Sequence, residues 1–379
     1  MAVTLTASNA LGIQVEASRI WNMDKTQSTQ QYSQPIPVIE KLAQMQSLRH
    51  LPIMTDGGRC VELKVWYPDL SDIMGGSVYS GATPNPAATC DIGTCASPGS
   101  LAKTYTPNVY ISHCFTISDN LCANDFDFQR QFAVSLNAIM LKIRTELNRR
   151  MIVSINSNAG ANVDAAGLTT LGWTTAGVNT TIPAVQWATA SILMKMALNA
   201  AKNRIQNGFV IVDGTNLWIE SALAPYIGLN DSTRSEGKLF ADYKDTYVAD
   251  IFNLDTAVGT NSTFVVNPAM LGFYNRAKYS KVPQQLDATN NTQAFSIDDP
   301  ELRNRFTELN ANGVQVNSPV MAPVQYDVLV QRSCTGRDAT GRPTYETKVE
   351  VMFEGAIITA PPGITPNHTT GILKYTKGA

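Results

Sequence analysis

Residues 123–151, with the sequence ANDFDFQRQFAVSLNAIMLKIRTELNRRM, decide the fold of this chain. Their large apolar residues recur three and four positions apart, which predicts one apolar stripe along a helix of about seven turns. The stripe consists of Phe132, Leu136, Ile139, Met140, Ile143, Leu147 and Met151. Asp125 and Asp127 fall in the first turn and Arg149 and Arg150 in the last, which is the order of charges that the helix dipole favours. Such a helix in a chain without a catalytic motif indicates a structural spine.

The composition of the 379-residue chain indicates two or three subdomains and a nearly neutral surface. Charged residues make up 16% of the chain and the formal net charge is −2, so the chain does not resemble a basic nucleic-acid reader. Few charges suit a protein that is largely covered by copies of itself, because interface cores are depleted of charge.

Targeting signals are absent from the sequence pattern. The first ten residues lack the basic and apolar regions of a signal peptide, and no apolar run approaches the ~20 residues that span a bilayer. We therefore expect a soluble protein that is made in the cytoplasm and has no membrane contact.

The first third of the chain predicts an arm, a small helix and a hairpin. Residues 1–33 are polar and irregular, which indicates an extended arm. A short helix follows Pro35 and Pro37, with apolar residues at Ile39, Leu42, Met45 and Leu48. Two alternating runs, Cys60–Trp66 and Val109–Ile117, are typical of strands, and we expect them to pair. The connection between them is rich in Gly, Pro and Ser and is either disordered or ordered by a neighbour.

The middle of the chain predicts an α/β unit. The nearly uncharged residues 154–182 indicate a surface loop or meander, and Pro183 opens a helix that stops at Asn207-Gly208. The strand-turn-helix pattern of residues 209–223 is repeated by residues 263–279.

The C-terminal part predicts strands. Tyr326–Val330 and Tyr345–Phe353 alternate and are joined by a turn at residues 335–341. Ile372–Tyr375 supplies a last strand.

This order of elements resembles the major capsid protein of tailed bacteriophages, the Hong Kong 97-type fold. The two phrases Phe209-Val210-Ile211-Val212-Asp213 and Phe264-Val265-Val266-Asn267-Pro268 look like strand ends of its axial domain. The resemblance implies an α+β fold with the following parts: 1–58, N-terminal arm and docking helix; 59–122, extended-loop hairpin; 123–182, spine helix and linker of the peripheral domain; 183–321, axial domain; 322–379, return strands of the peripheral sheet.

The resemblance also implies a function. It predicts a non-enzymatic coat protein of the virion that self-assembles into pentamers and hexamers, in the host cytoplasm, around a double-stranded DNA genome. Scaffolding, portal and decoration proteins are candidate partners, and contact with packaged DNA would be weak and non-specific. No long charged helix precedes the fold, so scaffolding would come from a separate protein or from sequence already removed. A cytosolic α/β enzyme and a tail or adhesin component remain as alternatives.

The search for catalytic chemistry favours the non-enzymatic interpretation. The chain has no phosphate-binding loop, zinc-protease motif, nucleophile elbow or dinucleotide-binding motif, and we expect no cofactor and no metal ion. His113 has no carboxylate or nucleophile at a working distance in sequence, so a role as general base is disfavoured. Residues 298–305 suggest a helix start more than a metal site, and Asp213 suggests a turn residue more than a ligand.

Cysteines offer two interpretations. Cys90 and Cys95 are spaced so that a disulfide could staple the tip of the long connection, and unlinked thiols are the alternative. Six cysteines in so long a chain do not make a disulfide scaffold, and a zinc site would need closer pairs.

The charge distribution suggests an inter-subunit contact. Residues 65–129 carry six acids, Asp69 and Asp72 among them, against one base. Residues 130–150 carry five bases, Arg144 and Arg149 among them, against one acid. In the capsid interpretation the extended loop lies over the neighbouring spine, where unlike charges would set register. Two solvated faces are the alternative.

Overall fold

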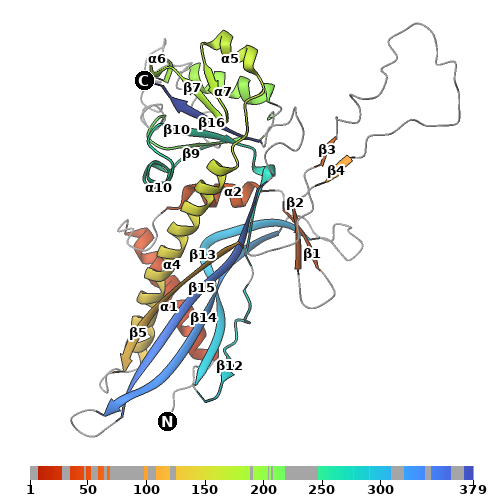
Figure 1. Cartoon of the computed structure of the whole chain (residues 1–379). Coiled ribbons are helices and arrows are strands. Elements are labelled where there is room, and N and C mark those ends of the chain that lie inside the picture. Colours follow the sequence, from red (N-terminus) through yellow and green to blue (C-terminus); the bar gives the residue numbers. More distant parts are fainter. Residues whose placement is uncertain are drawn as a thin grey trace, which may run out of the picture.

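A computed structural model shows one long helix beside a long sheet, with a smaller sheet at one end of the molecule (Figure 1). The predicted α+β class is confirmed. The structure describes residues 7–27, 35–46, 48–52, 59–63, 66–68, 98–100, 108–119, 125–187, 191–203, 205, 208–217, 246–275, 277–289, 291–308, 320–337, 343–359 and 371–378.

The bounds of the elements are as follows. The helices are α1 (Ala7–Thr26), α2 (Pro37–Met45), α4 (Asp125–Ser157), α5 (Ala165–Leu171), α6 (Ala184–Trp187), α7 (Ser191–Lys202), α10 (Ile251–Ala257) and the 3₁₀ helix η2 (Pro268–Met270). The strands are β1 (Leu48–Pro52), β2 (Arg59–Leu63), β3 (Trp66–Pro68), β4 (Pro98–Ser100), β5 (Val109–Asp119), β6 (Thr174–Ala176), β7 (Asn179–Ile182), β8 (Val210–Asp213), β9 (Tyr247–Ala249), β10 (Ser262–Val266), β11 (Leu271–Asn275), β12 (Gln284–Asp287), β13 (Thr292–Glu308), β14 (Val320–Arg337), β15 (Pro343–Thr359) and β16 (Ile372–Lys377).

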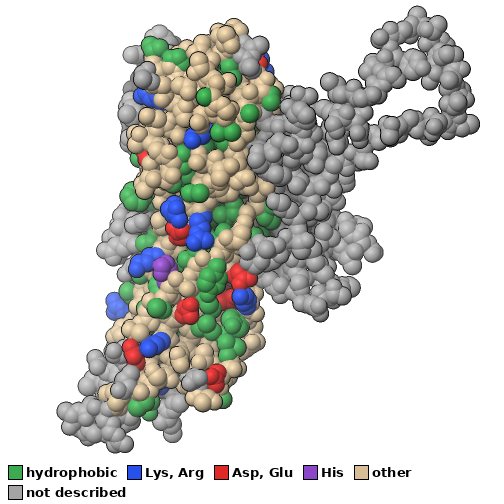
Figure 2. All heavy atoms as spheres, in the orientation of Figure 1, with side chains coloured by type: hydrophobic (Ala, Val, Ile, Leu, Met, Phe, Trp, Pro, Cys, Tyr) green, Lys and Arg blue, Asp and Glu red, His purple; other side chains and the backbone are tan. Residues whose placement is uncertain are grey.

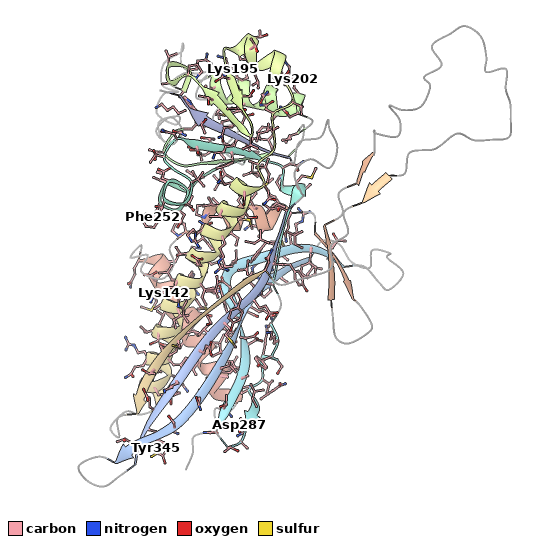
Figure 3. The ribbon with its side chains drawn as sticks, viewed as in Figure 1. Lys142, Lys195, Lys202, Phe252, Asp287 and Tyr345 are labelled. Atoms are coloured by element: carbon pink, nitrogen blue, oxygen red, sulfur yellow. The ribbon has the colours of Figure 1, made fainter. Side chains whose placement is uncertain are left out.

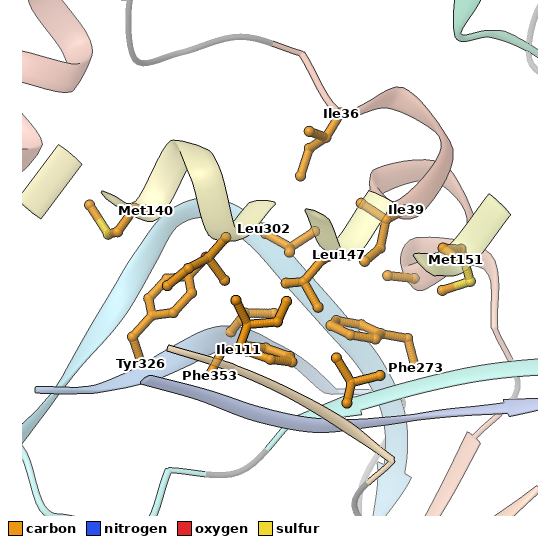
Figure 4. Close-up of a cluster of buried hydrophobic side chains, with 14 of the residues drawn as sticks. Ile36, Ile39, Ile111, Met140, Leu147, Met151, Phe273, Leu302, Tyr326 and Phe353 are labelled. Carbon is orange, nitrogen blue, oxygen red and sulfur yellow. The ribbon is translucent and has the colours of Figure 1, made fainter. Parts of the chain in front are cut away.

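Helix α4 is the predicted spine. Every residue of the predicted apolar stripe is at most 6% exposed, and the stripe packs into the same core as α1, α2 and the strands of the long sheet. Figure 4 shows this contact, with Met140 and Leu147 of the spine on the side of Tyr326 and Phe353 of the sheet, and with Met151 near Phe273 of β11. The helix runs past Met151 to Ser157, so the prediction that Arg149 and Arg150 occupy its last turn is wrong.

The predicted N-terminal arm is a helix in its described part. Helix α1 lies along α4 and buries one face, formed by Ala10, Ile13, Ala17 and Trp21. Large apolar residues such as Leu11 and Val15 lie outside this buried face, so the apolar residues of α1 do not keep to one face and the helical period is weak in the sequence. The short helix after Pro37 is confirmed as α2, whose Ile39 and Leu42 are fully buried.

The long sheet contains eight strands in the described part of the chain, in the order β11-β15-β14-β13-β1-β2, with β5 on β15 and β12 on β13. The predicted pairing of β14 with β15 is confirmed. The predicted hairpin is wrong in its partners, because β5 pairs antiparallel with β15 over its full length and β2 pairs with β1. An alternating sequence identifies a strand but not the neighbour to which it bonds. The short pair β3 and β4 forms a separate two-stranded sheet.

The smaller sheet has the order β6-β7-β16-β10-β8-β9. Strands β8, β10 and β16 confirm three predicted strands. This sheet, together with α5, α6, α7 and α10, is called the small domain below. The predicted domain boundaries cross both sheets: β11, β12 and β13 fall in the range 183–321 but belong to the long sheet, whereas β16 belongs to the small one.

Several predicted local structures differ from those observed. Residues 158–182 contain α5 and the hairpin of β6 and β7 as well as loops. The range of the helix predicted from Pro183 to Asn207 contains α6 and α7 in its described residues. The helix predicted after Asn267-Pro268 is a single 3₁₀ turn followed by strand β11. The helix start predicted at residues 298–305 is part of β13. Most of the helix predicted at residues 215–223 lies outside the described residues.

Candidate functional site

Three buried polar residues interrupt the apolar stripe of the spine. Asn137, Arg144 and Asn148 are each 0% exposed. Asn137 Nδ2 donates to the carbonyl oxygen of Ala17 in α1 at 3.0 Å. Asn148 Oδ1 accepts the backbone N–H of Ile39 in α2 at 3.1 Å, and its amide donates to the Asp250 carboxylate at the start of α10. The spine is therefore tied to α1, α2 and α10 by directional bonds as well as by apolar contact.

Arg144 is the buried centre of a group of charged and aromatic side chains. We call this group the Arg144 cluster, and its members are Trp21, Lys25, Glu40, Arg144, Asp299, Glu301 and Tyr326. Arg144 Nη2 lies 3.0 Å from Glu40 Oε1 and 3.5 Å from Glu301 Oε2, and Nε lies 3.7 Å from Asp299 Oδ2.

Aromatic residues and backbone groups complete the cluster. The Arg144 guanidinium carbon stands 4.5 Å from the centre of the Trp21 ring, within the range of a cation–π contact. Tyr326 donates its hydroxyl proton to Asp299 Oδ2 at 2.5 Å, and the N–H of Leu302 donates to Asp299 Oδ1 at 2.6 Å. Asp299 reaches the interior because the register of β13 on β14 shifts between Asp298 and Arg303.

The pKa shifts in the cluster follow from burial and charge. Burial is the largest influence on Arg144 and opposes its charge, but Asp299, Tyr326, Glu40 and Glu301 together outweigh burial and raise the pKa of Arg144. Burial raises the pKa of Glu40, and burial together with the charge of Asp299 raises the pKa of Tyr326 well above its ordinary value. Burial alone would raise the pKa of Glu301, but its bond to Lys25 and the charge of Arg144 lower it. The contacts of the cluster link α1, α2, α4 and β13 to one another.

The predicted inter-subunit role of Arg144 is wrong, since its side chain is buried inside its own chain. Arg149 has a side chain that is 48% exposed and pairs with Glu146 on the same helix at 2.7 Å. Asp69 and Asp72 lie outside the described residues, so their contact with Arg149 stays a prediction.

The other singled-out residues are placed as follows. Cys90 and Cys95 lie outside the described residues, and their disulfide stays a prediction. Cys114 and Cys334 are free and exposed. His113 lies on strand β5 and is exposed. Within the described residues, no His, Cys, Asp and Glu side chains gather in a group that could hold a metal ion. No described helix is both long and apolar enough to cross a membrane.

Asp213 is a buried acid at the end of strand β8. Its carboxylate accepts hydrogen bonds from Thr263 Oγ1 at 2.5 Å, from Leu217 N at 2.9 Å and from the Tyr247 hydroxyl at 2.9 Å. Burial raises the pKa of Asp213 to about 6 although these bonds act against the rise. The sequence suggested a turn residue, whereas the structure shows an acid that binds three surrounding segments.

Exposed apolar side chains mark the outer surface. On α1, Leu11 is 62% and Val15 60% exposed, and they line an open groove of ≈ 630 Å³ together with Arg19 and Lys281. On the small domain, Phe252 of α10 is 76% exposed. On the face in view, Figure 2 shows scattered hydrophobic side chains among interspersed charges of both signs. Singly scattered apolar side chains are ordinary on a protein surface, whereas the neighbouring Leu11 and Val15 in one groove are a candidate contact with another chain.

Comparison with known proteins gives similarities in structure alone. No family model matches the chain, and no curated protein matches it in sequence. The chain is similar to a solved structure from Mycobacterium phage Adephagia, with 10% identity and a TM-score of 0.38, over 92% of this chain and 94% of that chain.

Two further similarities concern particles. One is to the capsid structure of the cyanophage P-SCSP1u, with 13% identity and a TM-score of 0.34, over 87% of this chain and 86% of that chain. The other is to the procapsid of satellite phage P4 that includes the size determination (Sid) protein, with 8% identity and a TM-score of 0.30, over 94% of this chain and 100% of that chain.

The architecture of the chain is of the α+β class that the sequence predicted. The spine helix lies along the long, mostly antiparallel sheet, and the small domain stands at one end (Figure 1). Strands β1 and β2 form one edge of the long sheet, and the short sheet of β3 and β4 follows β2 in the chain.

Proposed function

We propose that this chain is a major capsid protein, which self-assembles into the icosahedral shell around a double-stranded DNA genome. The observation that carries the proposal is the arrangement of the spine, the long sheet, the small domain and the short sheet of β3 and β4 in one elongated chain. An elongated subunit with contacts along its length can touch several neighbours at once, which is what a closed lattice needs.

The chemistry of the surface supports self-association. Only 16% of the residues are charged, and exposed apolar side chains occur on α1, α7 and α10, which lie in different parts of the molecule. Interfaces are depleted of charge and anchored by apolar and aromatic residues. The charges of the Arg144 cluster pair among themselves, which supports a stabilising role for them.

The proposal extends to assembly and location. The chain joins copies of itself as pentamers and hexamers in the host cytoplasm and ends as part of the virion, without enzymatic activity of its own. Scaffolding, portal and decoration proteins are candidate partners, and packaged DNA meets the inner surface by weak non-specific contact.

The domain assignment follows the two sheets. The spine and the long sheet form the peripheral domain, the small domain is the axial domain near the capsomer centre, and residues between β2 and β5 form the extended loop. This assignment moves β16 to the axial domain and β11 to β13 to the peripheral domain, relative to the boundaries inferred from sequence.

Electron microscopy of the purified wild-type protein tests the proposal. We expect shells, or five- and sixfold capsomers, in negative stain. Small discrete oligomers or monomers under all conditions would argue for an enzyme or a tail component instead.

A further inference from the structure

Helix α1 has apolar side chains on two of its sides. One side is the buried face that packs along the spine. The other side is open to solvent and carries Leu11 and Val15, which are 62% and 60% exposed. A surface helix needs apolar residues only on the side that faces the core, so a second apolar side indicates a further contact.

The open side of α1 forms one wall of the groove of ≈ 630 Å³, a volume typical of clefts that bind ligands. Leu11, Val15, Ser18 and Asn22 line this wall. They lie three and four residues apart, so they follow one line along the helix. At 1.5 Å per residue this line is about 16 Å long, which matches about three turns of a second helix. Lys281, which precedes β12, lines the groove from the other side.

Both sides of the groove are attached to the body of the molecule. Asn137 of the spine donates to the carbonyl oxygen of Ala17 in α1 at 3.0 Å. The N–H of Ser296 in β13 donates to the carbonyl oxygen of Ser280, next to Lys281, at 2.8 Å. A surface that is fixed before binding loses little conformational entropy when a partner arrives.

The charges that the groove presents to solvent are cationic. Of the described residues that line it, Arg19 and Lys281 are charged and none is acidic. Each cation pairs with an acid, Arg19 with Glu16 at 2.6 Å and Lys281 with Asp298. The two acid side chains are only 14% and 20% exposed, whereas the cations are 50% and 56% exposed. A partner therefore meets cations that retain N–H groups for a second acid.

We propose that this groove binds an amphipathic helix of another protein, whose apolar stripe covers Leu11 and Val15 and whose acidic side chains lie beside Arg19 and Lys281. Helices bind in grooves through apolar residues at three- and four-residue intervals. A second copy of α1 is disfavoured as the occupant, because it would bring the exposed Arg19 of one copy to the cations of the other. The groove is formed within one chain, so this contact goes beyond the proposed function and does not rest on it.

Two labelled peptides test the contact on the full-length wild-type chain, kept below the concentration at which it assembles. Both are helical peptides of about 20 residues with the same stripe of leucines, long enough to cover the groove. One carries glutamates beside the stripe and the other carries lysines. Fluorescence anisotropy should show that the glutamate peptide binds at least about tenfold more tightly. The difference should shrink between about 0.1 M and 1 M salt, because salt screens exposed charges.

Variants of the groove locate the binding. Leu11→Asp replaces an apolar side chain of the groove with a charged one, so the glutamate peptide should bind at least about tenfold more weakly. Val15→Ser serves as a milder version if Leu11→Asp does not fold. Lys281→Gln removes one exposed cation and should narrow the difference between the two peptides.

Leu198→Asp is the matched control. Leu198 is 53% exposed on α7 and lies between Lys195 and Lys202 in the sequence, so it is also an exposed leucine with lysines nearby in the chain. Figure 3 shows Lys195 and Lys202 at the small-domain end of the molecule and Asp287 of β12 at the other end. This variant should bind the glutamate peptide as the wild type does.

Several results would overturn the contact: no binding of the glutamate peptide, equal binding of the two peptides, unchanged binding by the folded groove variants, or an equal loss in Leu198→Asp. Loss of self-association in Leu11→Asp without any peptide would assign the groove to a second copy instead. A chain that binds the glutamate peptide but never forms shells would fail the proposed function alone. Shells from a chain that binds neither peptide would fail this contact alone.

Discussion

Arg144 shows how one residue can hold an elongated subunit together. It lies on the spine and reaches charged or aromatic groups of α1, α2 and β13. The spacing of the sequence could have placed it in the interior, because it follows Met140 by four residues and precedes Leu147 by three, both of which are buried. Because the residue is an arginine, its type favoured a solvent-exposed side chain instead. The partners Glu40 and Asp299 come from distant segments that no local pattern connects to position 144.

Replacing Arg144 tests whether its cluster stabilises the chain. Arg144→Ala removes the cation beside the fully buried carboxylate of Asp299, and we expect a loss of about 3–5 kcal/mol in the free energy of unfolding. Arg149→Ala removes an exposed pair with Glu146 and should cost no more than about 1 kcal/mol. Urea unfolding followed by circular dichroism measures both variants. Equal midpoints for the two variants would show that the cluster does not hold the elements together.

Asp213 predicts a dependence of stability on pH. Its folded pKa is raised from 3.8 to about 6, so the folded chain holds this proton more tightly than the unfolded chain does. Between about pH 4 and pH 6 the unfolded state releases the proton first, and the contribution of Asp213 to stability falls as pH rises, by about 3 kcal/mol in total. The stability of wild type relative to Asp213→Asn should therefore fall across this window. A constant difference between the two proteins from pH 4 to pH 7 would contradict the assignment.

Elements were predictable where the signal was local. The seven positions of the apolar stripe gave the spine, and alternation gave β5, β14 and β15, because period and burial are linked along one segment. The partner of β5 was not predictable, since an alternating strand fits any free sheet edge and β15 lies far away in the chain. Helix α1 was missed because its buried face consists partly of alanines, which composition does not distinguish from a polar arm.

The spine offers a direct test of core packing. Leu136→Ala and Ile143→Ala remove side chains that are at most 1% exposed, and each should lower the free energy of unfolding by ~2–5 kcal/mol. Val153→Ala on the same helix, at 39% exposed, is the control and should cost less than about 1 kcal/mol. Thermal or urea unfolding of the three variants gives the answer. An unchanged midpoint for Leu136→Ala would mean that the stripe is not core.

The whole molecule depends on contacts between distant segments. The small sheet is completed by β16, the last described strand, which lies between β7 and β10. The long sheet likewise joins β1 to β13 in parallel. The local sequence does not indicate such long-range strand pairings. The domain boundaries inferred from sequence therefore separate strands of the same sheet. The exposed apolar groups were missed for a similar reason: the exposure of Leu11 and Phe252 becomes evident only when their helices are packed on the rest of the molecule.

The most direct test of self-assembly is the symmetry of wild-type particles in electron cryomicroscopy. The proposed function predicts rings of five and six copies that close into shells, with the small domains nearest the ring axes and the spines pointing outward. Particles with only twofold or threefold symmetry, or rings with the small domains at the outer edge, would contradict it.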